Sequence, residues 1–240
     1  MPEFRDVHHS RPPFLAVIQA RTELSELGPA LAEGLRSSDA VRVLGAFPPA
    51  RIASLHAEAE HAHAGGAFAA ARMGRTRDAR AAVRGDQLCW LGASPHPQGC
   101  DGLVAPASAA LLHDLDALRV ELDRTLLLGV RSVEAHYSLY APGTHYARHL
   151  DRFSDDRSIA GSMDGARVLS LVIYLNAGWD AADGGALRLH DGAGAAHDVT
   201  PQGGDLVAFL SDRVAHEVLP ATKPRWSIAA WLCQAASATL

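Results

Sequence analysis

Cysteine and lysine are both scarce in this chain. Its 240 residues include three cysteines, Cys89, Cys100 and Cys233, and none of them forms a Cys-x-x-Cys pair. A disulfide framework or a zinc knuckle is therefore not expected, and the cysteine usage fits a reducing cytoplasm. Lysine occurs only at Lys223, and the net charge is −5. This charge argues against a dedicated binder of nucleic acid or of a membrane surface.

Long apolar runs are also missing. No run is long enough to span a bilayer, and the first residues, MPEFRDVHHSRPP, lack the apolar stretch of a signal peptide. With 48% hydrophobic and 20% charged residues, the composition is that of a globular protein that can bury a core without disulfides. We predict a loosely ordered lead-in over residues 1–25 and a single domain over residues 26–240.

The pattern changes from helical to β-prone along the chain. Helices are predicted over Leu27–Leu35 and Arg51–His63, and a third where leucines recur at helical spacing: Leu111, Leu115, Leu118, Leu122 and Leu126. One short strand is predicted over Val41–Phe47, and the later β-prone runs are Val133–Tyr140, Val168–Leu175, Leu187–His190, Asp205–Ser211 and Trp226–Cys233. This order predicts an α+β, mainly β fold, a sandwich or jelly roll buttressed by N-terminal and central helices.

Two polar segments have competing interpretations. The second predicted helix holds two Glu-x-x-His spacings of the di-iron type, formed among His56, Glu58, Glu60, His61 and His63. Matching carboxylates from other long helices are missing, so we interpret this set as a solvated face. The arginine-rich stretch Arg72–Arg84 is either a solvated connection or a mobile basic flap, because long loops in compact domains are often functional.

A metal-binding pattern follows in the β-prone half. His149 and Asp151 come just after a strand-like segment, and alternate residues of an extended chain point the same way. His216 follows the strand that ends near Leu210. Two histidines and one carboxylate form the facial triad of non-haem Fe(II) oxygenases, which leaves three metal positions open. His190 and His197 are rival third ligands, although no arginine follows His190 at the spacing described next.

Arg225 lies nine residues after His216 and opens the next predicted strand. Two open metal positions accept a chelating 2-oxo acid, and the third accepts O2. The far carboxylate of the acid then needs a fixed cation, and the planar guanidinium binds a carboxylate through two hydrogen bonds without losing its charge. We therefore predict that Arg225 binds this carboxylate, with a tyrosine hydroxyl as helper.

Several motifs, in this order, resemble the prolyl hydroxylase domain family of 2-oxoglutarate oxygenases. They are Arg84-Gly-Asp86-Gln-Leu-Cys-Trp90, Tyr140-Ala-Pro-Gly-Thr-His-Tyr146-Ala-Arg-His149-Leu-Asp151, Tyr174-Leu-Asn176-Ala-Gly-Trp179, Gly184-Gly-Ala-Leu-Arg-Leu189, Ser211-Asp-Arg-Val-Ala-His216-Glu-Val-Leu-Pro220 and Arg225-Trp-Ser-Ile-Ala-Ala-Trp231. The resemblance covers about residues 67–234. It implies a double-stranded β-helix of the cupin-like jelly-roll type, with the metal inside its mouth.

The resemblance also implies a role for each motif residue. The implied Fe(II) ligands are His149, Asp151 and His216. The implied cosubstrate residues are Arg225 and Tyr174 for the distal carboxylate, Tyr140 lining the pocket, and Trp231 packed beside it. The implied substrate residues are Arg167, Asp86 and Arg84. Asp86 and Arg84, together with the arginine-rich loop, would form a flap that closes over a peptide. Two departures are a polar insert over residues 152–166 and Ala229, which stands where animal members carry a threonine.

The expected function is therefore a dioxygenase that uses Fe(II), 2-oxoglutarate and O2, with ascorbate as reductant, to hydroxylate a prolyl residue. The expected partner is a protein substrate, such as a translation factor or a ribosomal protein, and the expected location is the cytoplasm. One alternative is hydroxylation of a free amino acid or another small molecule. The other is a jelly-roll metal or ligand sensor without turnover. The sequence is silent on oligomeric state.

Overall fold

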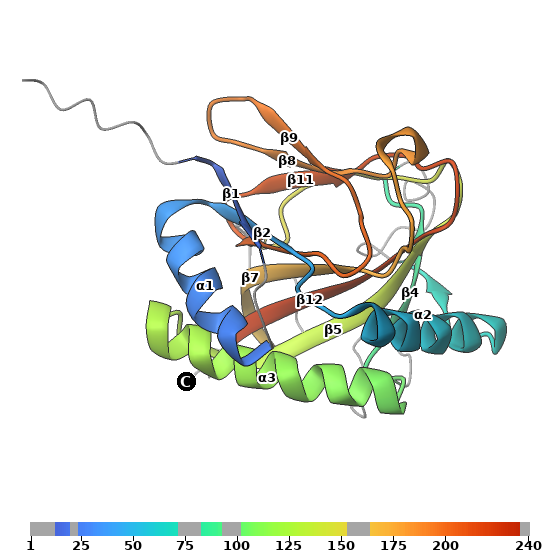
Figure 1. The fold of residues 1–240 in the computed structure, drawn as a ribbon, viewed down its shortest axis with the longest axis horizontal. Helices are drawn as coiled ribbons and strands as arrows, with labels where there is room; N and C mark the ends of the chain where they lie inside the picture. The colour runs from blue at the N-terminus through green and yellow to red at the C-terminus, as the bar shows by residue number, and fades with distance from the viewer. Residues whose placement is uncertain (1–12, 20–23, 72–82, 93–101, 153–163, 236–240) are drawn as a thin grey trace, which may run out of the picture.

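A computed structural model describes residues 13–19, 24–71, 83–92, 102–152 and 164–235. In this part of the chain two β-sheets face each other, and three helices cover the outer face of the larger sheet (Figure 1). The larger sheet has the order β1-β2-β10-β7-β12-β5-β4-β3, and the smaller has the order β6-β11-β8-β9. The arrangement is the mainly β jelly roll with helical support that the sequence predicts.

The elements have the following bounds. The helices are α1 (Leu24–Ser37), α2 (Pro49–Ala64), α3 (Pro106–Leu126) and a 3₁₀ turn, η1 (Ala181–Asp183). The strands of the larger sheet are β1 (Leu15–Gln19), β2 (Ala40–Leu44), β3 (Ala69–Ala70), β4 (Asp86–Trp90), β5 (Val130–Tyr140), β7 (Asp164–Tyr174), β10 (Leu206–Leu210) and β12 (Arg225–Ala235). Those of the smaller sheet are β6 (Tyr146–His149), β8 (Leu187–His190), β9 (Ala196–Val199) and β11 (Ala215–Val218).

The side chains of β12 alternate between the apolar core, which the helices cover, and the inner face of the larger sheet, which faces the smaller sheet. Because side chains of a strand alternate between its two faces, Trp226, Ile228, Ala230 and Leu232 enter the apolar core that includes the buried leucines of α1, α2 and α3. Arg225, Ser227, Ala229 and Trp231 therefore lie on the opposite face. That face meets the smaller sheet, where Tyr140 and Tyr174 share an apolar cluster with Leu187, Leu189 and Val218. The space between the two sheets is thus lined partly by polar side chains.

The second helix is not the solvated face that its histidines and glutamates suggest. The Glu58 carboxylate accepts hydrogen bonds from the backbone N–H groups of Ala107 (2.8 Å) and Ser108 (3.1 Å) in the first turn of α3. It also accepts one from the Tyr137 hydroxyl at 3.0 Å. A carboxylate at a helix N-terminus satisfies free N–H groups and favours the helix dipole. The solvated-face expectation is therefore wrong for Glu58, which joins α2, α3 and β5.

The predicted helices and the five later strands are confirmed, with ends shifted by a few residues. The lead-in is corrected at one place, because Leu15–Gln19 forms β1, which pairs in parallel with β2. Residues 1–12 and 20–23 of the lead-in, the loop over 72–82 and most of the insert, 153–163, lie outside the described residues. Whether residues 26–240 fold as a single domain stays a prediction.

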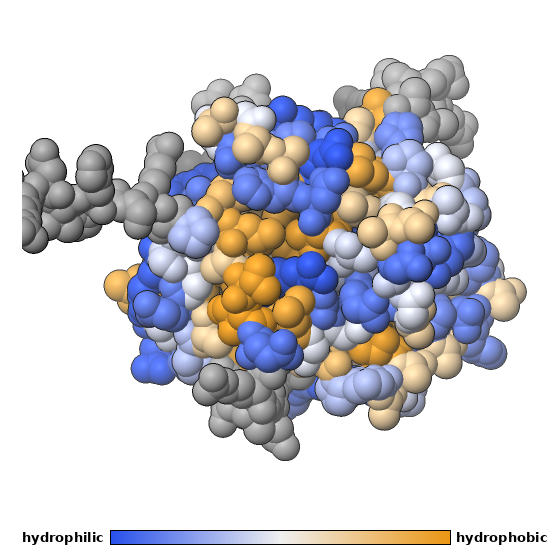
Figure 2. Space-filling view, turned by 45° about the horizontal axis from the view of Figure 1, so that its top comes forward, coloured by the Kyte–Doolittle hydropathy of each residue, from blue (hydrophilic) through white to orange (hydrophobic). Residues whose placement is uncertain are grey.

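No helix among the described residues is both long enough and apolar enough to cross a membrane. Figure 2 shows hydrophilic side chains over most of one face of the molecule, with a patch of apolar side chains near the middle of that face.

Candidate metal centre and carboxylate pocket

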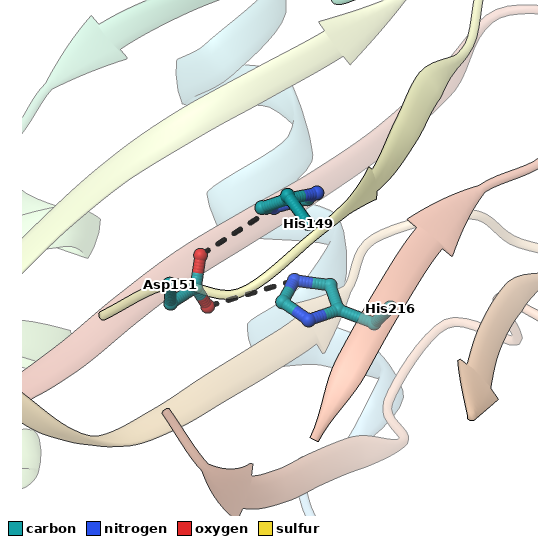
Figure 3. Close-up of side chains that lie close together, drawn as sticks. All are labelled: His149, Asp151 and His216. Carbon is teal, nitrogen blue, oxygen red and sulfur yellow. Dashed lines mark ion pairs between the residues drawn. The ribbon is translucent and has the colours of Figure 1, made fainter. Parts of the chain in front are cut away.

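Three predicted ligands come together between the two sheets. His149 is the last residue of β6, Asp151 follows two residues later, and His216 lies on β11 in direct register with His149. The side chains point toward one another (Figure 3), and their ligand atoms all lie within 4.8 Å. The His149 Nε2 atom is 3.5 Å from Asp151 Oδ1, and the His216 Nε2 atom is 3.6 Å from Asp151 Oδ2. Among the described residues, no second cluster of this kind is found.

The rival histidines have other partners. His190 Nε2 lies 2.9 Å from Glu217 Oε1, and His197 Nε2 lies 3.4 Å from Asp191 Oδ2. Neither histidine belongs to the three-residue cluster. The geometry therefore favours His216 as the third member of the triad.

Backbone carbonyls orient both imidazoles of the cluster. His149 Nδ1 lies 2.9 Å from the Ala147 oxygen, and His216 Nδ1 lies 3.1 Å from the Val214 oxygen. Each carbonyl oxygen only accepts hydrogen bonds, so Nδ1 carries the proton and the Nε2 lone pair is left for a cation. The Tyr146 ring stacks on the His149 ring, with centroids 3.6 Å apart, and restrains it further.

The protonation states of the cluster suit a divalent metal. Burial raises the pKa of the Asp151 carboxyl, but His216 and His149 outweigh that effect and hold this pKa well below its ordinary value. Burial lowers the pKa of His216 to about 4, against the attraction of Asp151. At neutral pH the site therefore offers an ionised carboxylate and a neutral imidazole, which are the forms that bind metal. Two imidazole nitrogens and one carboxylate are donors that fit Fe(II).

The stability of the metal-free protein is expected to fall between about pH 6.5 and pH 4. The pKa of His216 is about 4 in the folded protein and 6.5 in an unperturbed histidine. Between these pH values His216 is therefore protonated in the unfolded chain and neutral in the folded protein. Stability therefore rises with pH across this window and is lost on acidification, by up to about 3 kcal/mol. Urea unfolding with a chelator, at both ends of the window, measures this. The His216→Gln variant should show a weaker pH dependence, and an equal dependence would contradict the assignment.

A second feature of the inner face is a buried guanidinium without an acidic partner. Arg225 is 1% exposed, and no carboxylate among the described residues forms an ion pair with it. Its Nε donates to the Gly185 oxygen (2.8 Å) and its Nη1 to Ser227 Oγ (3.2 Å). Buried charges are normally paired. This arrangement therefore predicts an anionic ligand.

Two tyrosines flank this guanidinium. The ring centroids of Tyr140 and Tyr174 lie 5.2 and 5.4 Å from the Arg225 Cζ atom. The Tyr174 hydroxyl is buried beside Arg225, and no acceptor among the described residues takes its proton. Burial raises the pKa of Tyr174 to about 12, although Arg225 opposes the shift, so the hydroxyl keeps its proton. A neutral hydroxyl whose proton has no acceptor, beside a buried cation, is suited to donate to a bound carboxylate.

Gly185 leaves space for the Arg225 side chain, a role that its sequence position did not reveal. Its φ of +68° favours glycine. An added Cβ would lie 3.1 Å from the Arg225 Cδ atom and 2.9 Å from the Ala221 Cβ atom. The Gly184-Gly185 pair in the motif therefore both permits the turn and leaves room for the arginine.

The predicted substrate residues form two internally paired groups. Arg84 donates to Asp86 through Nε (2.6 Å) and Nη2 (2.9 Å), and the Asp86 side chain is fully buried. The Asp86 carboxylate thus holds Arg84 in place, and a contact of Asp86 with a peptide stays a prediction. The Arg84 guanidinium lies 4.6 Å from the Tyr146 ring centroid. Arg84 thus reaches the ring that stacks on His149.

The second group lies around Trp231. The Arg167 Cζ atom is 3.6 Å from the Trp231 ring centroid, and Arg167 donates to Glu134 at 2.8 Å. The rings of His136, Trp90 and Trp231 pack against one another, and the His136 centroid lies 4.8 Å from that of Trp90 and 5.2 Å from that of Trp231. Sequence reasoning did not single out His136, because a lone histidine within a strand carries no spacing signal.

The fold and the cluster together define the class of protein, a jelly roll with a two-histidine, one-carboxylate metal centre. Residues 135–233 match the profile of the 2OG-Fe(II) oxygenase superfamily. The crystal structure of a Pseudomonas putida prolyl-4-hydroxylase is 35% identical, with a TM-score of 0.71, over 86% of this chain and 98% of that one. This chain therefore belongs to the 2OG-Fe(II) oxygenase superfamily.

Other relatives are similar in fold or in sequence. A Trichoplax adhaerens prolyl hydroxylase, solved with a hypoxia inducible factor peptide fragment, has a TM-score of 0.71 at 22% identity, over 88% of this chain and 90% of that one. Mouse Egl nine homolog 1 is 32% identical over 62% of this chain, and human prolyl hydroxylase EGLN3 is 31% identical over 62%. The chain spans 35% and 58% of the length of these two relatives.

Proposed function

We propose that this protein is an Fe(II)- and 2-oxoglutarate-dependent dioxygenase that hydroxylates a prolyl residue of a protein substrate and releases succinate and CO2. The observation that carries the proposal is the presence of two complementary sites on facing inner surfaces. The His149, Asp151 and His216 cluster suits a metal, and the unpaired Arg225 suits the far carboxylate of a dicarboxylic acid. The similarity to the Pseudomonas putida prolyl-4-hydroxylase over nearly its whole length supports the prolyl target.

Each residue has a defined task in this proposal. His149, Asp151 and His216 would hold Fe(II), and Arg225 with the Tyr174 hydroxyl would hold the distal carboxylate of 2-oxoglutarate, in a pocket lined by Tyr140. When bound, the metal and 2-oxoglutarate supply the oxidising chemistry with O2. The buried apolar residues Leu187, Leu189 and Val218 exclude water between the sheets, which strengthens the pairing of Arg225 with the carboxylate. Trp231 packs on the same inner face as Arg225.

The paired charges favour a peptide over a free amino acid. A free amino acid brings an ammonium and a carboxylate, each of which needs a partner when it is buried. Near Trp231 and Tyr146, Arg167 and Arg84 are already paired with Glu134 and Asp86. The aromatic cluster of Trp90, His136 and Trp231 lies beside the Arg167–Glu134 pair, and aromatic surroundings suit a prolyl ring better than a second charged group. The arginine-rich stretch 72–84 would contact the chain on either side of the target.

Finer parts of the proposal rest on the sequence. We propose a translation factor or a ribosomal protein as the substrate, ascorbate as the reductant, and the cytoplasm as the location. The low cysteine content of the sequence supports the location. The family resemblance of the motifs supports the substrate class and the reductant.

Turnover and proteome analysis test the function together. Purified protein with Fe(II), ascorbate and 2-oxoglutarate should form succinate, and a digest of host proteins should stimulate it. Mass spectrometry of the host proteome, with and without the gene, should find one added oxygen on a prolyl residue. Stimulation by free amino acids alone would favour the small-molecule alternative. Binding of metal and 2-oxoglutarate without any succinate would favour the sensor and overturn the proposal.

A further inference from the structure

Asp151 is held by a side chain from outside the metal cluster. Its Oδ2 atom accepts a hydrogen bond from Ser170 Oγ at 2.7 Å. Ser170 Oγ in turn lies 2.8 Å from Ser211 Oγ. Ser170 and Ser211 are 1% and 0% exposed. The second oxygen of the carboxylate therefore ends a buried chain of two hydroxyl groups.

Chemistry fixes the direction of this chain. An ionised carboxylate only accepts hydrogen bonds, so the Ser170 hydroxyl must donate its proton to Asp151. Ser170 has then no proton left for its neighbour, and the Ser211 hydroxyl must donate to Ser170. Both hydroxyls are thus aligned toward Asp151, and hydrogen bonds to a charged acceptor are the stronger kind.

The backbone around the two serines is held by the larger sheet, whereas Asp151 lies outside regular secondary structure. Asp151 lies in a bend just after β6, outside regular secondary structure. Ser170 lies within β7, paired on both sides with Trp231 of β12 and Phe209 of β10. The Ser211 oxygen accepts from the Arg152 N–H at 3.0 Å, and its own N–H donates to the Val168 oxygen at 3.0 Å. The two serines therefore tie the bend that carries Asp151 to the rigid larger sheet.

We propose that Ser170, supported by Ser211, is a positioning residue that holds the Asp151 carboxylate in a one-oxygen binding mode. This inference rests on the proposed metal site. A carboxylate that bound through both oxygens would occupy one of the positions that 2-oxoglutarate and O2 need. With Oδ2 engaged by a hydroxyl that the sheet keeps in place, rotation of the carboxylate into that mode is disfavoured.

Manganese binding, followed by the electron paramagnetic resonance signal of free Mn(II), tests the inference without turnover. Outer partners of metal ligands contribute about 10- to 100-fold in metal affinity, and we expect a loss of that size for Ser170→Ala. Ser170→Thr keeps the hydroxyl and should bind Mn(II) with nearly wild-type affinity. Ser211→Ala should lose less Mn(II) affinity than Ser170→Ala. Ser138→Ala is the matched control, because Ser138 is buried on the same inner face but lies 3.0 Å from His136 Nδ1.

The outcomes separate this inference from the proposed function. Wild-type affinity in Ser170→Ala, or an equal loss in Ser170→Thr, would overturn the positioning role and leave the metal site intact. A wild-type protein that does not bind Mn(II) would overturn the proposed function, and the inference with it. If Ser170→Ala does not fold, Ser211→Ala carries the test, since it leaves Ser170 in place and removes only its donor.

Discussion

Arg225→Gln is expected to weaken 2-oxoglutarate binding by about 30- to 5,000-fold, the equivalent of about 2–5 kcal/mol for a buried charge pair that loses one member. The buried guanidinium has no acidic partner among the described residues, so we assign the ligand carboxylate as its counter-charge. Glutamine keeps polar hydrogens in the pocket but removes the charge. Calorimetry of the Mn(II)-loaded protein, without O2, measures the change.

Two variants sharpen this prediction. Arg225→Lys keeps the charge and loses the planar fork, so it should bind better than Arg225→Gln and worse than wild type. Tyr174→Phe removes a single hydroxyl, and a hydrogen bond to a charged group contributes about 1.5–3 kcal/mol, so the loss should be smaller. Mn(II) affinity should be unchanged in all three variants. Normal 2-oxoglutarate binding by Arg225→Gln would show that the carboxylate is held elsewhere.

Asp151→Asn is expected to reduce Mn(II) or Fe(II) affinity by more than about 100-fold, since loss of an outer partner alone costs about 10- to 100-fold. The substitution keeps the shape of the side chain and an oxygen that can accept from Ser170, so the fold should persist. It removes the one negative charge in the cluster, and a divalent cation is left with two neutral imidazoles. Succinate formation should fall below detection.

His190→Ala is the matched control for this prediction. His190 is a histidine that the sequence left as a rival ligand, and it pairs with Glu217 away from the cluster. Metal affinity should be unchanged in this variant. If His190→Ala lost metal affinity and Asp151→Asn retained it, the metal would bind elsewhere than at the proposed cluster.

Local spacing accounts for the parts of the site that the sequence could predict. His149 and Asp151 are two residues apart, and the period of an extended chain brings them together. His216 and Arg225 lie on β11 and β12, which are consecutive in the chain and belong to the two facing sheets, so one short segment carries both residues. The third predicted helix likewise follows from its leucines, which form one buried face in α3.

Long-range contacts account for what the sequence could not predict. Ser170 reaches Asp151 across 19 residues and Ser211 across 41, and a serine in a strand has no spacing signal that names its partner. Glu58 meets Ala107 49 residues away, and its helical spacing to histidines suggested a different role. The strands β6 and β11 were not among the predicted strands, because each has four residues that include a histidine and a charged residue, and neither is a β-prone run.

The most direct test is a crystal structure with diffraction data collected at the X-ray absorption edge of iron. The crystals would be grown without O2 in the presence of Fe(II) and 2-oxoglutarate. The account predicts one anomalous peak per chain, within coordination distance of His149 Nε2, His216 Nε2 and one oxygen of Asp151. It also predicts the far carboxylate of 2-oxoglutarate against Arg225 and the Tyr174 hydroxyl. An iron peak away from these three side chains, or a carboxylate that leaves Arg225 unpaired, would contradict it.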